Sequence, residues 1–213
     1  MNDFEGKTGK IRREYQAGQL DRAQLSSDPH VLFQQWLQEV VDADVLDATA
    51  MTLATVDQNG RPAARIVLLK GLNNQGLQFF TDYSSRKGQE IASNPQVAVL
   101  FYWKEVNRQV RITGTLEKLS DLVNESYFDS RPEMSRWAAI ASDQSQPVQD
   151  RQTLEAAMRN AQNVGDLMKP ARWGGYHLYP DSFEFWQGRP NRLHDRFLYI
   201  LEDDTWRIAR LQP

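Results

Sequence analysis

The chain of 213 residues contains no cysteine and only three histidines, at positions 30, 177 and 194. The lack of cysteine excludes disulfides, thiolate metal ligands and a cysteine nucleophile. Three histidines so far apart in the sequence argue against a histidine-based metal site, so no metal centre is expected. Any redox chemistry is therefore expected to need an organic cofactor.

Other absences narrow the class of protein further. No apolar run approaches the roughly 20 residues that span a bilayer, and the first residues lack the apolar segment of a secretory signal. With the lack of cysteine, this predicts a cytoplasmic protein without membrane contact. The net charge of −3 provides no basic field for nucleic acid. No Gly-x-Gly-x-x-Gly follows a strand and no Gly-Lys-Ser/Thr loop occurs, which argues against Rossmann and P-loop nucleotide sites.

The chain divides by composition into an arm and a body. Residues 1–27 are polar and charged, and we expect a mobile arm with a short helix near residues 11–15. Residues 28–213 are expected to form one domain. Asp28 and Pro29 are a typical N-cap and first helical residue. Apolar residues follow at helical spacing and predict an amphipathic helix to about Ala43: Leu32, Phe33, Trp36, Leu37, Val40 and Val41.

Most of the remaining chain alternates with the period of a strand. Helices are expected only over 86–93, 121–129 and 150–163. Hairpin-type connections between strands favour an antiparallel barrel with attached helices over a parallel βαβ sheet. The expected strands are 51–56, 63–69, 77–81, 97–103, 108–119, 173–179, 183–187, 196–201 and 206–211.

The segment 184–197 carries the most informative side chains. Arg189, Arg192 and Arg196 fall within eight residues, together with His194 and Asp195. Guanidinium groups so close repel one another unless an anion lies among them, and arginine grips phosphate or carboxylate in a bidentate way. The imidazole can change charge near neutral pH. A solvated network of surface ion pairs is the alternative, but flanking aromatic residues favour a partly buried anion site with chemistry attached.

Two further basic clusters precede it. Arg65 and Lys70 close the two ends of an apolar strand and should face opposite sides, which predicts two anions or a site shared between subunits. A surface charge at a strand end is the alternative. The segment 84–87, Ser-Ser-Arg-Lys, combines hydroxyls, a helix start and two cations, as a phosphate site requires. Alone, it would equally describe a capped surface helix.

Two more clusters lie near the middle of the chain. Gln109 is expected to face away from both Arg108 and Arg111, where an amide could read the edge of a planar heterocycle. An ordinary polar residue of an edge strand is the alternative. Residues 127–135 supply Tyr, Arg and Ser at a helix end, as a phosphate cradle or as helix capping. Together the clusters exceed what one small anion needs and suggest two phosphorylated ligands, a cofactor and a substrate.

In this order, the motifs resemble those of pyridoxine/pyridoxamine 5′-phosphate oxidases, flavin enzymes that make pyridoxal 5′-phosphate. The resemblance runs from residue 12 to the C-terminus. It rests on Arg12-Arg-Glu-Tyr15, Arg65-Ile-Val-Leu-Leu-Lys70, Ser85-Arg-Lys87, Arg108-Gln109, Tyr127, Ser130-Arg-Pro132, Gln144-Ser145, Phe185-Trp-Gln-Gly188 and Arg192-Leu-His-Asp-Arg196.

The resemblance implies a mainly β fold with peripheral helices, the FMN-binding split β-barrel, and a homodimer with active sites at the subunit interface. Arg65, Arg86 and Lys87 would hold the FMN phosphate region. Phe80 stands where a Tyr can occur, so only a backbone contact is expected there. The implied FMN-binding residues are Arg65, Ile66, Val67, Leu68, Leu69, Lys70, Phe80, Thr81, Arg86, Lys87, Gln109, Gln144, Ser145, Trp186 and Arg196.

The resemblance also assigns the substrate. Arg192, Leu193 and His194 would lie against the substrate ring, with Arg192 and His194 as the catalytic residues. Arg189 receives no role. Four residues would grip the substrate phosphate, Lys70, Tyr127, Arg131 and Ser135, and four from the arm would close over the pocket, Arg12, Arg13, Glu14 and Tyr15.

The implied reaction is oxidation of pyridoxine and pyridoxamine 5′-phosphates to pyridoxal 5′-phosphate. FMN and dioxygen would be used, hydrogen peroxide released, and ammonia formed from the amine. One alternative is a non-catalytic carrier or sensor that holds FMN or pyridoxal phosphate on the same barrel. Another is a flavin-dependent reductase with a nicotinamide or deazaflavin donor, which would not need the cradle at 127–135.

Overall fold

The computed structural model describes residues 18–213. The expected arm helix and the four arm residues, Arg12, Arg13, Glu14 and Tyr15, lie outside the described residues, and the division into an arm and one domain stays a prediction. The described chain forms two compact units. The first contains residues 18–48, 102–111 and 182–213, and the second contains residues 49–101 and 112–181.

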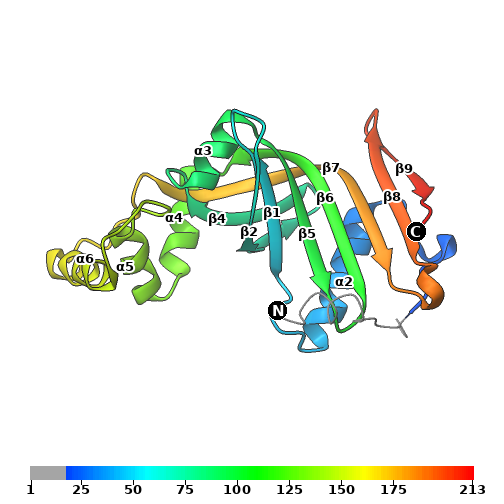
Figure 1. Cartoon of the computed structure of the whole chain (residues 1–213), viewed down its shortest axis with the longest axis horizontal. Helices are drawn as coiled ribbons and strands as arrows, with labels where there is room; N and C mark the ends of the chain where they lie inside the picture. The colour runs from blue at the N-terminus through cyan, green and yellow to red at the C-terminus, as the bar shows by residue number, and fades with distance from the viewer. Residues whose placement is uncertain (1–17) are drawn as a thin grey trace, which may run out of the picture. The chain divides into compact units, whose positions relative to one another are not determined.

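The first unit combines one long helix with the C-terminal strands. It contains the short 3₁₀ helices η1 (Arg22–Gln24) and η2 (Pro190–Arg192), helix α2 (Pro29–Asp42), and strands β8 (Asp195–Glu202) and β9 (Thr205–Arg210). The end of strand β7 (Trp173–Gln187) pairs antiparallel with β8, and β8 pairs antiparallel with β9. Figure 1 shows β8 and β9 as the orange and red hairpin that ends the chain.

Helix α2 begins as predicted. The Asp28 carboxylate accepts a hydrogen bond from the backbone N–H of His30 at 2.9 Å, and Pro29 takes the first helical position. The residues that pack inward are Leu32, Phe33, Trp36 and Val40. Val41, expected on the same apolar face, is 45% exposed. The buried face of α2 is therefore narrower than the apolar pattern of the sequence suggested.

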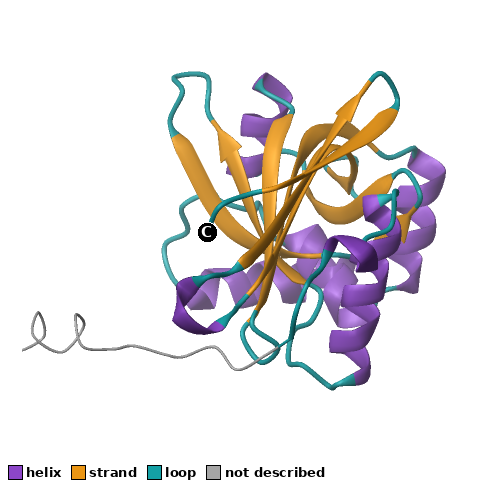
Figure 2. Ribbon diagram, turned by 90° about the vertical axis from the view of Figure 1, so that its right-hand side faces the viewer, coloured by secondary structure: helices purple, strands orange, loops and turns teal. Residues whose placement is uncertain are grey.

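The second unit is an antiparallel sheet with four helices. Its strands are ordered β2-β1-β5-β6-β7-β4-β3, and strands β5, β6 and β7 contribute residues to both units. Figure 2 shows the strands as strongly twisted ribbons. The elements are β1 (Ala50–Val56), β2 (Pro62–Leu68), β3 (Gly71–Asn73), β4 (Gly76–Asp82), α3 (Arg86–Ser93), β5 (Gln96–Trp103), β6 (Arg108–Lys118), α4 (Asp121–Ser130), α5 (Glu133–Ala141) and α6 (Arg151–Val164).

The mainly β fold with antiparallel strands and peripheral helices is confirmed. The β1–β2, β1–β5, β3–β4 and β4–β7 pairs are all antiparallel. The apolar core of the second unit lies under these strands and includes Leu53, Leu77, Phe79, Phe101 and Ile112, each at most 1% exposed.

Strand β7 is one strand of 15 residues, although two strands separated at Pro180 were predicted. Proline breaks most strands because it cannot donate to the ladder. Here β6 approaches closely: a Cβ on Gly114 would lie 2.1 Å from the carbonyl oxygen of Tyr179 and 2.9 Å from the Cα of Pro180. A glycine opposite the proline therefore lets the strand continue.

Three local predictions were wrong. Helix α5 was not predicted; it begins directly after Pro132, and Trp137 donates to the Glu133 carboxylate across one turn at 3.0 Å. The three-residue strand β3 was also not predicted. In β6 the buried residues are 110, 112, 114 and 116, so Gln109 and Arg111 lie on the same face rather than on opposite ones.

Candidate functional site

A cavity of about 540 Å³ lies in the second unit and collects most of the predicted ligand-binding residues of that unit. Residues expected to contact the cofactor and residues expected to grip the substrate phosphate share its wall. They come from β2, β4, α3, α4, α5 and the loop after α5. The lining residues are Ile66, Val67, Leu68, Lys70, Phe80, Thr81, Asp82, Lys87, Tyr127, Arg131, Ser135, Ala138, Ala139, Ser142, Gln144 and Trp173.

Stacked aromatic rings form one side of the cavity. The ring centroids of Phe80 and Tyr127 lie 3.8 Å apart at 14°, and the Trp173 ring lies 5.5 Å from that of Phe80. The Arg131 guanidinium lies over the Trp173 ring at 4.9 Å. Burial raises the pKa of the Tyr127 hydroxyl. Trp173 was not among the predicted site residues, because a buried aromatic residue at a strand start looks like ordinary core.

Arg131 is a half-buried cation without an anionic partner among the described residues. Its Nη1 atom is buried and makes no hydrogen bond. Burial also lowers the pKa of its guanidinium, since the charged form is poorly solvated there. An unsatisfied buried donor costs stability, roughly 1 to 3 kcal/mol and more when charged. An anion bound in the cavity beside Arg131 Nη1 would accept this hydrogen bond and balance the charge.

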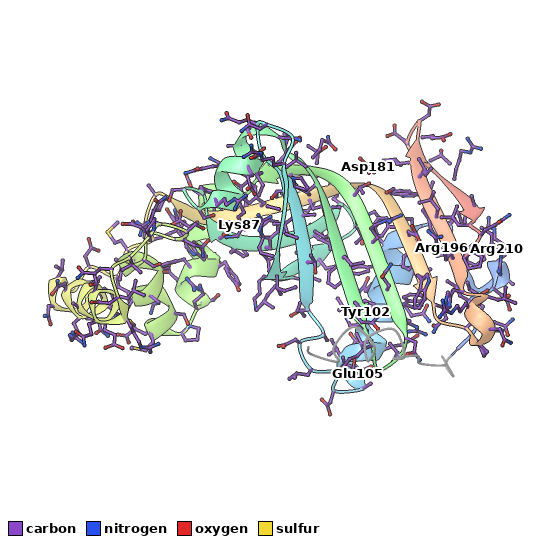
Figure 3. The ribbon with its side chains drawn as sticks, viewed as in Figure 1. Lys87, Tyr102, Glu105, Asp181, Arg196 and Arg210 are labelled. Carbon is purple, nitrogen blue, oxygen red and sulfur yellow. The ribbon has the colours of Figure 1, made fainter. Side chains whose placement is uncertain are left out.

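Lys87 provides a second cation in the cavity, and Figure 3 labels it. Its Nζ donates to the Thr81 hydroxyl at 3.0 Å and to Gln144 Oε1 at 2.5 Å. Both acceptors are neutral. Burial, and then the charge of Arg65, lower the pKa of Lys87. Ser85 caps the start of α3, as its sequence predicted, by accepting from the backbone N–H of Gly88.

Arg65 and Arg86 do not line the cavity. Arg65 donates to the carbonyl oxygen of Leu53, to the Thr55 hydroxyl and to Glu90 Oε2, the last at 2.8 Å. Arg86 Nε donates to Glu90 Oε1 at 2.8 Å. Burial alone would raise the pKa of Glu90, but hydrogen bonds from Thr55, Arg86 and Arg65 outweigh it, so the pKa is lowered. Lys70, in contrast, lines the cavity. The two cations predicted at the ends of β2 therefore differ: Arg65 pairs with Glu90, and Lys70 faces the cavity.

In the first unit, carboxylates of the chain itself lie among the arginines of residues 184–197. Glu184 pairs with Arg196 at 2.7 Å and also with Arg111. Asp195 pairs with Arg210 at 2.9 Å and lies 3.5 Å from Arg189. The side chains of Glu184 and Asp195 are only 4% and 10% exposed. An ion-pair network thus explains much of this charge, with buried carboxylates and partly exposed arginines.

His194 belongs to the same segment. Its Nδ1 accepts a hydrogen bond from the backbone N–H of Arg189 at 3.1 Å, which places the proton of the neutral ring on Nε2. Burial, and then the charge of Arg192, lower the pKa of His194 and favour that neutral form. The Trp186 ring lies 4.7 Å from the imidazole. Arg192 is exposed at a turn with a φ of 59°.

The remaining predicted residues are placed as follows. Leu69 is buried, Ser145 has a φ of 74°, and neither lines the cavity. Six predicted residues belong to the first unit and do not line it either: Gln109, Trp186, Arg192, Leu193, His194 and Arg196. Residues 18–213 contain no group of three or more potential metal ligands. No helix in that range is long and apolar enough to cross a membrane.

Solved structures share this fold. PhzG from Burkholderia lata, in complex with tetrahydrophenazine-1-carboxylic acid, matches with a TM-score of 0.88 and 30% identity over 92% of this chain and 99% of that chain. A pyridoxamine 5′-phosphate oxidase-related, FMN-binding protein from Nostoc punctiforme matches with a TM-score of 0.70 at 22% identity, covering 89% and 99% of the two chains. The predicted split-barrel fold is confirmed.

Sequence comparisons agree with the structural ones. Curated relatives described as pyridoxine/pyridoxamine 5′-phosphate oxidases are 49% identical in Paraburkholderia phytofirmans, over 96% of this chain and 98% of the relative, and 48% identical in Idiomarina loihiensis, over 95% and 98%. Residues 173–213 match the pyridoxine 5′-phosphate oxidase C-terminal dimerisation region, and residues 37–165 match the family described as pyridoxamine 5′-phosphate oxidase. The chain belongs to the pyridoxamine 5′-phosphate oxidase family.

Proposed function

We propose that this protein oxidises pyridoxine 5′-phosphate and pyridoxamine 5′-phosphate to pyridoxal 5′-phosphate with FMN and dioxygen. Hydrogen peroxide is the second product, and the amine substrate also yields ammonia. The observation that carries the proposal is the cavity itself. Within residues 18–213, Lys70 and Arg131 have no carboxylate partner, and both lie in the cavity wall with Lys87 and a stack of aromatic rings. Membership of the family supports the same reaction.

The cavity fits a phosphorylated flavin. Lys87, Thr81 and Gln144 form a connected polar group that can bind ring or phosphate atoms, and the N-terminus of α3 lies beside it. We propose that these residues hold FMN, with Arg65 and Arg86 contributing positive charge. FMN supplies the two-electron acceptor that returns its electrons to dioxygen.

The other half of the wall suits the substrate phosphate. The buried Nη1 of Arg131 needs an acceptor, and Lys70, Tyr127 and Ser135 line the same cavity. A phosphate would accept from all four side chains, and charge-assisted hydrogen bonds are the strong ones. The substrate ring would then lie near the stacked rings of Phe80 and Tyr127.

We infer a homodimer in which Trp186, Arg192, His194 and Arg196 complete the active site at the subunit interface. The match to a dimerisation region supports this assembly. Arg192 would press its guanidinium against the pyridine ring and fix the distance to the flavin. His194 carries its proton on Nε2, so it can donate to the 4′ substituent and orient it. A neutral histidine with that tautomer does not act as a base through Nε2.

An aerobic assay tests the proposal directly. Purified protein is loaded with FMN and mixed with pyridoxine 5′-phosphate, and aldehyde and peroxide are measured. Formation of both products in equal amounts supports the oxidase. A bound flavin that is never reduced would show a carrier, and reduction only by a nicotinamide or deazaflavin donor would show a reductase.

The role of Arg192 has its own prediction. Substitution Arg192→Leu should slow flavin reduction by about 100-fold, because the guanidinium positions the ring. FMN affinity should change little. Anaerobic stopped-flow measurements give the reduction rate, and a fluorescence titration gives the affinity. An unchanged reduction rate would remove the assigned role.

A further inference from the structure

Arg172 does not line the cavity, and neither the motifs nor the family resemblance singles it out. It lies one residue before β7, and its side chain is 28% exposed. We propose that Arg172 is a positioning residue that joins two walls of the cavity, the turn before α3 and the end of α5. This inference rests on the proposed function, because the groups it positions are those that would bind FMN and substrate.

The first set of contacts closes helix α5. Arg172 Nη2 donates to the carbonyl oxygens of Ile140 and Ser142, each at 2.9 Å, and to that of Ala139 at 3.3 Å. The last carbonyls of a helix have no partner within the helix and carry partial negative charge. A cation there stabilises the helix end. Ala139 and Ser142 line the cavity, so their carbonyl contacts fix part of its wall.

The second set of contacts fixes the turn between β4 and α3. Arg172 Nε lies 2.9 Å from Asp82 Oδ2, as an ion pair without a well-aligned hydrogen bond. The Asp82 side chain is only 5% exposed, and its Oδ1 accepts from the backbone N–H of Ser84 at 2.7 Å. The carbonyl oxygen of Arg172 accepts from the backbone N–H of Tyr83 at 2.7 Å. Arg172 thus holds the turn by its side chain and its backbone.

The two walls meet at Gln144. This residue follows Ser142 by two positions, and its Oε1 accepts from Lys87 Nζ at 2.5 Å and from the Thr81 hydroxyl at 3.1 Å. Gln144 is itself exposed, so its own packing does little to hold it in place. A planar guanidinium can contact a carboxylate with one edge and several carbonyls with another, which an ammonium group cannot do. Arg172 therefore sets the distance between Gln144 and Lys87.

Loss of the Arg172 side chain should weaken the binding of both FMN and the substrate. The turn before α3 and Gln144 would bind FMN, whereas α5 carries Ser135, which would bind the substrate phosphate. Substitution Arg172→Met should raise the FMN dissociation constant by about tenfold, equivalent to about 1.4 kcal/mol. It should also raise the KM for pyridoxine 5′-phosphate at saturating FMN. The kcat should stay within about twofold, since the group makes no contact that changes in the transition state.

The experiment uses the full chain and two measurements. FMN affinity of the apoprotein is measured by quenching of flavin fluorescence, and KM and kcat are measured on the FMN-saturated protein. Arg136→Met is the matched control, because Arg136 lies on α5, pairs with Asp129 at 3.7 Å and does not line the cavity. The control should leave the FMN affinity and KM unchanged. Arg172→Lys should give intermediate values, since it keeps the charge beside Asp82 but not the carbonyl contacts.

A double-mutant cycle separates positioning from general loss of stability. If Arg172 acts through Gln144, then Gln144→Ala combined with Arg172→Met should weaken FMN binding little more than Gln144→Ala alone. Full additivity, or an FMN affinity unchanged by Arg172→Met, would overturn the inference. Should Arg172→Met fail to fold, the same cycle with Arg172→Lys decides. A wild-type protein that binds no FMN would instead refute the proposed function.

Discussion

Arginine and lysine side chains occur in two regions of this protein under opposite conditions. In the segment 184–197, Glu184 and Asp195 supply buried negative charge to the surrounding arginines. In the cavity wall, Arg131 and Lys70 have no ion-pair partner within residues 18–213, and Lys87 donates to neutral oxygens. The first region is neutralised by the chain, and the second awaits an external anion.

This difference separates cations that stabilise the fold from cations available to a ligand. A buried ion pair that loses one partner leaves an uncompensated charge, so its removal affects folding strongly. Arg131, a half-buried cation without a partner within residues 18–213, already carries that cost, and Lys70 is exposed, so removal of either should affect binding rather than folding. Glu90 pairs with both Arg65 and Arg86, so these two arginines also stabilise the fold, and their contribution of positive charge to the FMN phosphate stays a proposal.

The largest effect is expected at Glu90. Substitution Glu90→Leu leaves Arg65 without its carboxylate and should lower the free energy of unfolding by about 3 to 5 kcal/mol. Glu90→Gln should cost less, because an amide oxygen can still accept from Thr55. Urea denaturation of the apoprotein measures both, with Glu125→Leu as the exposed control on α4. A loss no larger than in the control would place Glu90 outside the folding network.

The Glu90 contribution also depends on pH. Its pKa is lowered from the ordinary value of 4.5, so the ionised form is favoured in the folded state. The stabilisation is therefore complete above 4.5 and lost as the pH falls through the lowered value. The difference in stability between wild type and Glu90→Gln should shrink over that acidic range, and a difference independent of pH would contradict the pairing.

A smaller effect, on binding alone, is expected at Arg131. Substitution Arg131→Met removes a charge-assisted phosphate contact and should raise the KM for pyridoxine 5′-phosphate by about 10- to 100-fold. The melting temperature should stay equal or rise, because a buried donor without a partner disappears. Pyridoxine without phosphate serves as control and should be turned over equally by both proteins. A large loss of stability would mean that Arg131 stabilises the fold and is not a cation kept available for a ligand.

The smallest effect is expected from the ionisation of Lys87. Burial lowers its pKa from 10.5, so the cavity loses this charge at a lower pH than an ordinary lysine would. FMN affinity should therefore fall a few-fold, beginning below pH 10.5. Lys87→Arg stays charged and should show no such decline. Fluorescence titrations across the alkaline range compare the two proteins, and parallel curves would contradict the assignment.

The fold was largely predictable because its signals are local. The cap at Asp28 and the alternating strands appear both in the sequence and in the structure. Helix α5 was not predicted; proline precedes its first residue directly, and a proline can begin a helix as well as end one. The continuity of β7 depends on Gly114 in another strand, which no local pattern of residues 173–187 can reveal.

The sequence predicted which residues of the second unit would share a cavity, but not their ion pairing. The motifs identified Lys70, Tyr127, Arg131 and Ser135, and the structure brings these four to one cavity. The sequence could not show that Arg65 binds Glu90, because a pairing between residues 25 positions apart depends on how β2 lies against α3. The contacts of Arg172 were not predictable either, because they depend on how distant segments pack against one another.

Anaerobic reduction of the bound flavin tests the central claim most directly, namely that the cations of the cavity wall select a phosphorylated substrate for FMN. FMN-loaded wild-type protein is mixed without oxygen with pyridoxine 5′-phosphate or with pyridoxine, and flavin absorbance is followed. The phosphate ester should bleach the flavin at concentrations at least about 100-fold lower than pyridoxine, from two or more charge-assisted contacts. Equal bleaching by the two compounds, or none by either, would contradict the claim.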